Sequence, residues 1–146
     1  MLTRRVVEAL LLSCLSLPLA QAATPVAEPA CGEQLVGKVT RIDNAAYRLA
    51  FRSTPSPIVM GTHFSLDIAV CPLAGNPVAN ALRVDAIMPA HQHGMNYAPS
   101  LRQISPGLYR ADGLMFHMPG LWEFRFEIRG KPSSMPERLS YQLTLD

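Results

Sequence analysis

The chain has 146 residues, of which 49% are hydrophobic and 16% charged, and its formal net charge at pH 7 is +2. This length is sufficient for one domain with one hydrophobic core. A charge so close to neutral excludes a strongly basic nucleic-acid-binding protein, and it gives no reason to expect an anionic membrane surface as a partner.

The first residues have the pattern of a secretory signal peptide. Arg4 and Arg5 precede an apolar run over residues 6–20, and Ala-Gln-Ala at 20–22 fits the small-x-small rule for signal cleavage. The run is too short for a comfortable membrane span. We therefore expect residues 1–22 to be removed, the protein to be exported to the periplasm, and the mature chain to contain no membrane span.

The chain contains three cysteines. Leu-Leu-Ser-Cys at 11–14 loosely resembles a lipoprotein cleavage box, so the alternative to a cleaved signal peptide is a lipoprotein anchored through Cys14. The apolar run continues past Cys14, which favours cleavage after residue 22. Cys31 and Cys71 remain in an oxidising compartment, where an even pair predicts a disulfide. The other interpretation is that one of the two is a thiolate ligand.

Residues 23–45 are expected to form an N-terminal leader that is partly mobile, because residues 23–30 are rich in Ala, Pro and Thr. Residues 32–43 are ambiguous, since their apolar residues suit either a short strand or one helical turn. We expect residues 46–146 to form the folded domain.

Apolar and polar residues alternate repeatedly through residues 46–146, which is the period of a half-buried strand. The expected strands are 47–51, 64–70, 81–88, 101–104, 108–115, 121–129 and 139–145. Trp122 lies in the most regular of them, so we expect it to be buried against Phe64, Leu66 or Val84. Gly and Pro turns separate the strands, and no helical repeat extends over a dozen positions. The sequence predicts an all-β fold, a single immunoglobulin-like antiparallel β-sandwich of about seven strands.

Two of the four histidines lie in Met-Pro-Ala-His-Gln-His-Gly-Met, over residues 88–95. Imidazole nitrogen and thioether sulfur are neutral ligands that suit copper, above all Cu(I). If residues 90–95 are extended, His91, His93 and Met95 project from the same face. We predict that these three residues form the main part of a copper site, with Cu(I) favoured over Cu(II) and zinc as the weaker alternative.

A second cluster, Phe-His-Met-Pro-Gly at 116–120, follows the expected strand 108–115. If that strand and strand 81–88 run the same way, their C-terminal loops reach the same end of the sandwich. We therefore expect His117 to lie close to His91 or His93 and to close the copper site, with Met88 and Met118 as optional ligands. The remaining methionines are assigned to packing or to the surface, and His63 to an exposed strand start.

Several enzyme and electron-transfer classes fit the sequence poorly. A blue-copper protein needs a Cys and two His around its metal, but no His or Met closely follows Cys31 or Cys71. A histidine-brace oxygenase needs an N-terminal histidine, and Ala23 is the expected first residue. Zinc hydrolysis on three histidines lacks a carboxylate in either cluster to act as general base. We predict a non-enzymatic periplasmic copper carrier or buffer; the alternative is a metal-free assembly module whose His/Met loop contacts a partner protein.

Residues 85–99 and 107–123 resemble the YtkA-like and FixH-like group of small exported domains. The resemblance covers residues 56–146 and is most specific at 88–95 and at Phe-His-Met-Pro-Gly-Leu-Trp-Glu, 116–123. It implies an immunoglobulin-like sandwich and a role in copper handling, with a copper-accepting protein such as an oxidase assembly factor as partner. The chain also resembles, in function, periplasmic copper chaperones of the PCuAC and CopC kind. Its His/Met spacings differ from theirs, so their ligand sets do not transfer.

Overall fold

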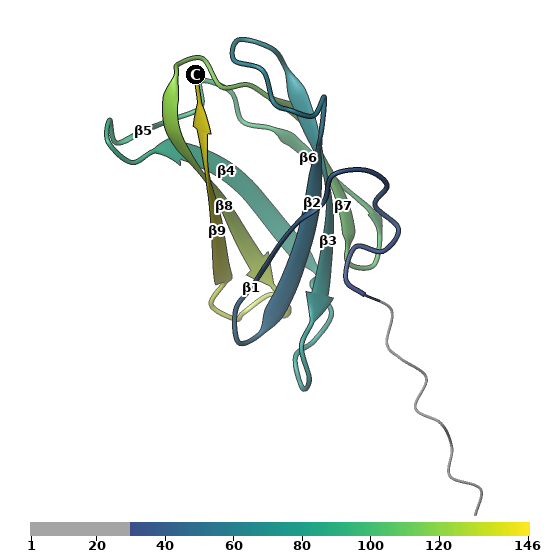
Figure 1. The fold of residues 1–146 in the computed structure, drawn as a ribbon. Coiled ribbons are helices and arrows are strands. Elements are labelled where there is room, and N and C mark those ends of the chain that lie inside the picture. Colours follow the sequence, from purple (N-terminus) through teal and green to yellow (C-terminus); the bar gives the residue numbers. More distant parts are fainter. Residues whose placement is uncertain (1–29) are drawn as a thin grey trace, which may run out of the picture.

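The computed structural model describes residues 30–146. The predicted signal peptide, Cys14 and residues 23–29 of the leader lie outside the described residues. The described chain forms two antiparallel β-sheets that face each other across a hydrophobic core (Figure 1). Within residues 30–146, no helix is long and apolar enough to cross a membrane.

The larger sheet has the strand order β1-β2-β3-β7-β6, and the smaller sheet has the order β5-β4-β8-β9. The strands are β1 (Thr40–Asp43), β2 (Tyr47–Thr54), β3 (Phe64–Pro72), β4 (Ala81–Met88), β5 (His93–Gly94), β6 (Ser100–Ser105), β7 (Leu108–Leu114), β8 (Gly120–Arg129) and β9 (Glu137–Leu145).

Seven of the strands follow the immunoglobulin topology. Strands β2, β3, β7 and β6 are arranged like A, B, E and D of an immunoglobulin domain, and β4, β8 and β9 like C, F and G. Strand β5 lies beside β4, where a variable-type domain has its additional strand C′. The predicted immunoglobulin-like β-sandwich is therefore confirmed, and β1 and β5 add two strands to the expected seven.

Part of the predicted leader belongs to the sandwich. Residues 31–34 form a turn, and β1 pairs with β2 from Thr40↔Phe51 to Asp43↔Arg48. Of the two interpretations of residues 32–43, only the short strand is found, at Thr40–Asp43; residues 31–34 form a turn that is not helical. Cys31 and Cys71 form a disulfide with a Cα–Cα distance of 5.9 Å, which ties the turn to the end of β3 and leaves neither sulfur as a thiolate.

The inward side of β8 forms a large part of the hydrophobic core. The inward residues of β8, including Trp122 and Phe124, are fully buried, as the alternating pattern predicts. The Trp122 ring stacks on Phe116 with centroids 4.5 Å apart, and Phe116 in turn packs against Phe64 at 5.1 Å. Trp122 is therefore buried as expected, but the ring on which it stacks is Phe116, which is not among the expected neighbours Phe64, Leu66 and Val84.

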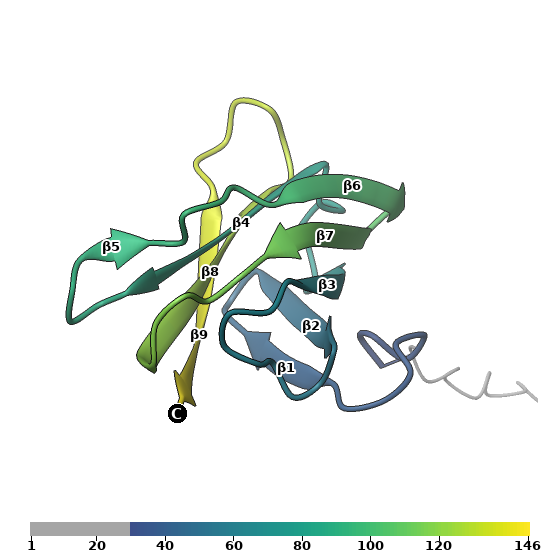
Figure 2. The same ribbon diagram turned by 90° about the horizontal axis from the view of Figure 1, so that it is seen from above.

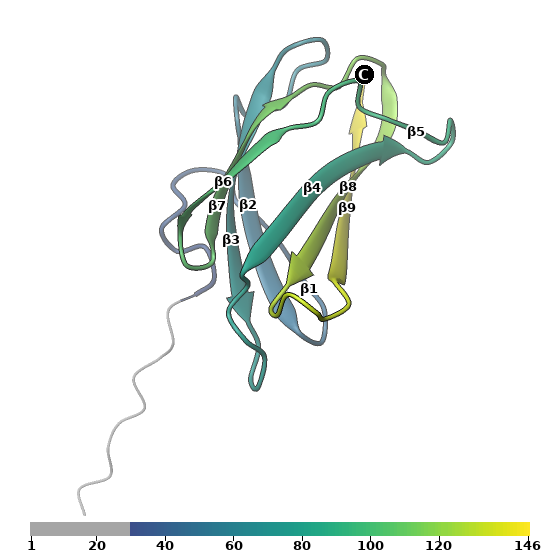
Figure 3. The same ribbon diagram turned by 180° about the vertical axis from the view of Figure 1, so that it is seen from behind.

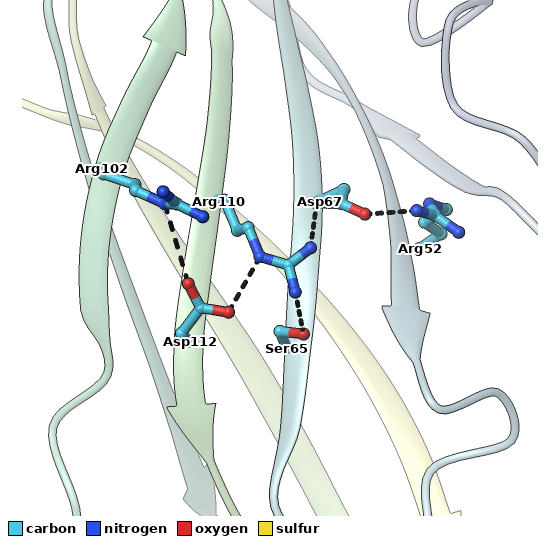
Figure 4. Close-up of polar contacts among 6 residues, drawn as sticks. All are labelled: Arg52, Ser65, Asp67, Arg102, Arg110 and Asp112. Atoms are coloured by element: carbon cyan, nitrogen blue, oxygen red, sulfur yellow. Dashed lines mark hydrogen bonds and ion pairs between the residues drawn. The ribbon is translucent and has the colours of Figure 1, made fainter.

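Charged side chains occupy the outer face of the larger sheet and join its strands (Figure 4). Asp67 on β3 pairs with Arg52 on β2 at 2.6 Å and with Arg110 on β7 at 2.7 Å. Arg110 also donates hydrogen bonds to Ser65 and Asp112. The hydrogen bond to Asp67 is the main reason that the pKa of Arg110 is raised. This network links β2, β3 and β7 across the outer face of the larger sheet.

Candidate metal centre

The two His/Met clusters lie at the same end of the sandwich, the upper end in Figure 1. Strand β4 runs into the hairpin that carries β5 (Figure 3), and β7 runs into the segment 115–119 that leads to β8 (Figure 2). The two strands belong to different sheets, so their loops meet across the end of the sandwich. The topological expectation that both clusters reach one end is confirmed.

The first cluster forms a tight hairpin. Residues 89–92 reverse the chain, and the backbone N–H groups of His91 and Gln92 donate to the Met88 carbonyl at 3.2 and 2.9 Å. Gln92 adopts a φ of 55°, and His93 then pairs with Met88 across the hairpin. The expectation that residues 90–95 are extended is therefore wrong, because two local hydrogen bonds to one carbonyl bend the chain. His91 lies exposed in the turn, whereas His93 lies half-buried in β5.

His93 and His117 are neighbours across the two clusters. Their ring centroids are 5.4 Å apart, and the ring planes differ by 32°. A metal–imidazole bond is about 2 Å long and a ring nitrogen lies about 1.2 Å from the ring centre, so two rings on one ion have centres at most about 6.4 Å apart. The predicted proximity of His117 to the first cluster is confirmed, and the separation is within reach of one shared ion.

The hydrogen bonding of His93 determines which of its nitrogens is free. Its Nδ1 lies 3.1 Å from the carbonyl oxygen of Gly94. A carbonyl oxygen only accepts hydrogen bonds, so Nδ1 is the donor in this contact, and in the neutral ring Nε2 is then the nitrogen with the lone pair. Metal-binding histidines commonly use this arrangement, in which one nitrogen donates to a backbone carbonyl and the other binds the ion.

His117 has an unpaired buried nitrogen. Its Nδ1 is buried and has no hydrogen-bond partner among the described residues. Leaving a buried polar group unpaired costs about 1–3 kcal/mol. Packing alone gives no reason to place a histidine rather than an apolar residue here, whereas a bound metal ion would satisfy the nitrogen.

Trp122 supports both histidine rings. The ring centroids of Trp122 and His93 are 6.1 Å apart, those of Trp122 and His117 are 5.6 Å apart, and both contacts are edge-on. The Trp122 Nε1–H donates to the Met118 carbonyl at 2.9 Å. The indole therefore connects the histidine pair to the core and fixes the backbone next to His117.

The methionines of the two clusters differ in burial. Met88 is 2% exposed and lies in the core, with its methyl end close to Gly120, where φ is +116°. A Cβ at position 120 would lie 3.1 Å from that methyl group, so glycine suits both the backbone and the packing there. Core packing therefore accounts for the burial of Met88 without a metal. Met95 and Met118 are half-buried at the margin of the core.

The histidines meet in pairs. In residues 30–146, no three His, Cys, Asp or Glu side chains are placed to hold one metal ion together. His91 and His93 have ring centroids 5.9 Å apart, so His93 lies between two neighbours. The predicted arrangement of His91, His93 and His117 around one ion, copper or zinc, is therefore not found in residues 30–146. Imidazole and thioether donors suit Cu(I) better than zinc.

The sequence reasoning missed one neighbour of this end of the molecule. His63 is exposed, as expected, but its ring lies 5.7 Å from that of Tyr97. The loop before His63 is tied to the second cluster by a hydrogen bond from the Gly61 N–H to the Phe116 carbonyl, at 2.8 Å. No local pattern in the sequence connects these residues, because only the sandwich topology brings the start of β3 to the end of β7.

In comparisons with known proteins, no family model matches this chain and no curated protein matches it. Among solved structures, it is similar to a DUF4426 family protein from Pseudomonas aeruginosa PAO1, at 10% identity and a TM-score of 0.47, over 74% of this chain and 96% of that chain. It is also similar to a copper-bound variant of FetP from uropathogenic Escherichia coli strain F11, at 10% identity and a TM-score of 0.47, over 75% of this chain and 98% of that chain.

Proposed function

We propose that this protein binds one copper ion between His93 and His117 and acts, after export, as a periplasmic copper carrier or buffer. The observation that carries the proposal is the buried Nδ1 of His117, which has no hydrogen-bond partner among the described residues. The centre of the His117 ring is 5.4 Å from the centre of the His93 ring. A metal ion between the rings would satisfy this nitrogen and use the free Nε2 of His93.

The donor set favours Cu(I). His93 would bind through Nε2 and His117 through Nδ1, and Met95 or Met118 would supply a thioether as third ligand. All of these donors are neutral. Both donor types, imidazole nitrogen and thioether sulfur, are soft or borderline, which suits Cu(I) better than Cu(II) or zinc. A singly charged ion bound by neutral ligands also requires less charge compensation than a divalent one.

The same donor set supports a carrier rather than an enzyme. Neither cluster contains a carboxylate that could act as a general base beside the ion. His93 and His117 are both half-buried, so the site lies just below the surface of the molecule, with the His117 Nδ1 itself buried. Neutral ligands at an accessible edge can be exchanged one at a time with those of another protein. A copper-accepting protein, such as an oxidase assembly factor, is the partner that this role requires.

The test is a titration of the purified protein with Cu(I), under anaerobic conditions and in competition with a chromophoric chelator. We expect one equivalent to bind and His93→Ala to lose most of the affinity with an unchanged β-sheet circular dichroism spectrum. His63→Ala is the matched control, because it removes an exposed histidine from the same end of the molecule. It should change neither the copper affinity nor the circular dichroism spectrum. Wild-type protein that binds no copper, or His93→Ala protein that binds it as tightly, would contradict the proposal. The His/Met loop would then remain as a metal-free contact surface for a partner protein.

A further inference from the structure

Three histidines of the site form a row with graded exposure. His91 is exposed at the tip of the hairpin, His93 is half-buried in the middle, and His117 is half-buried with its Nδ1 enclosed. The ring centroids are 5.9 Å apart from His91 to His93 and 5.4 Å apart from His93 to His117. Both distances lie within the reach of about 6.4 Å that follows from two bonds of about 2 Å to one ion.

The row provides two pairs of ligands rather than one group of three. No three metal-binding His, Cys, Asp or Glu side chains come together in the described part of the chain. His93 can therefore share an ion with His91 or with His117, but the three rings are not arranged around a common centre. His93 is the ring common to both pairs, and its orientation is held by the hydrogen bond to Gly94 and by the pairing of β5 with β4.

We propose that His91 and His93 form an outer entry site for copper, from which the ion moves to the inner site between His93 and His117. This inference rests on the copper-binding function proposed above. His93 stays bonded to the ion throughout. The bond to His91 breaks as the bond to His117 forms, and the copper keeps its oxidation state. The step needs no proton donor, oxidant or reductant.

The direction of the transfer follows from burial. An incoming partner or chelator reaches the exposed His91 most easily, because this residue lies in the turn at the tip of the hairpin. The inner pair includes the buried nitrogen that is otherwise unpaired, so binding there recovers the cost of leaving it unsatisfied. Copper should therefore enter and leave through His91 and rest at His117. His91 then determines the exchange rate, whereas His117 determines the affinity.

The experiment compares rates with equilibrium affinities. Cu(I) transfer between the protein and bathocuproine disulfonate is followed by stopped flow in both directions, and the dissociation constant is measured by competition with the same chelator. In His91→Ala, we expect both transfer rates to fall by about tenfold or more, while the dissociation constant changes by less than about threefold. In His117→Asn, we expect the dissociation constant to rise by about tenfold or more, with rapid exchange retained.

The controls separate the relay from copper binding itself. His63→Ala should leave both the rates and the affinity unchanged. His91→Ala protein that exchanges copper at the wild-type rate would overturn the relay and leave the inner site intact. A loss of affinity in His91→Ala as large as that in His117→Asn would also overturn it, since one ion would then need all three rings. Wild-type protein that binds no Cu(I) would instead refute the proposed function. Circular dichroism and Trp122 fluorescence check that each variant is folded.

Discussion

Replacing His117 with phenylalanine should stabilise the metal-free protein. Phenylalanine has a planar ring of similar shape but no ring nitrogen, so the substitution removes the buried, unpaired Nδ1. An unsatisfied buried polar group costs about 1–3 kcal/mol, and we expect the free energy of unfolding to increase by an amount in that range. For a domain of about 100 residues, each kcal/mol corresponds to roughly 4–8 °C in Tm.

The assay is urea unfolding of the metal-free protein in the presence of a chelator, followed by the fluorescence of the single tryptophan. Copper should reverse the order of stability. Free Cu(I) at a thousandfold excess over its dissociation constant stabilises a one-site protein by about 4.1 kcal/mol, which exceeds the expected advantage of the variant, and this gain should be lost in His117→Phe. His63→Phe, at an exposed position beside Tyr97, is the matched control and should change neither quantity.

Two results would refute the reasoning. If metal-free His117→Phe were clearly less stable than the wild type, the histidine would contribute favourable packing or polar contacts, and its nitrogen would not be a cost. If the variant gained as much stability from Cu(I) as the wild type, the ion would not bind to His117.

Two further predictions concern the scaffold. Trp122→Ala should lower the free energy of unfolding by about 3–5 kcal/mol, because the fully buried indole stacks on Phe116. A fluorescence emission maximum typical of solvated indole in the native wild type would show that this packing is wrong. Burial raises the pKa of Tyr109, whose hydroxyl donates to the Ala79 carbonyl at 2.9 Å. The folded state therefore holds the phenol proton of Tyr109 more tightly than the unfolded state does. The resulting contribution to the free energy of unfolding is present below pH 10 and is lost as the pH rises through the raised pKa. Near pH 7, Tyr109→Phe should be less stable than the wild type by about 0.5–1.5 kcal/mol. Above pH 10, its free energy of unfolding, measured with urea across the pH range, should fall less steeply than that of the wild type. An equally steep fall in the variant would contradict the argument.

Most of the sandwich follows from local patterns in the sequence. A strand with one buried face alternates with period two, and residues 121–129 show this so clearly that the buried side chains of β8 were identified in advance. The end of β4 at Met88 was also predicted, because Pro89 cannot donate a hydrogen bond to a neighbouring strand. Strand β5 was missed, since two residues are too few to establish a period.

The residue types of the candidate site were also readable from the sequence, but their arrangement was not. The clustering of His and Met over residues 88–95 and 116–120 predicts a copper site from the donor types alone. Which histidines pair depends on the hairpin turn, where two hydrogen bonds to the Met88 carbonyl direct His91 outward and leave His93 beside β4. His117 reaches His93 only because β4 and β7, in different sheets, end on the same side of the sandwich. The hydrogen bond that orients the His93 ring depends on the backbone geometry of the hairpin, and the burial of the His117 Nδ1 depends on residues that are distant in sequence. Both arise only in the folded chain.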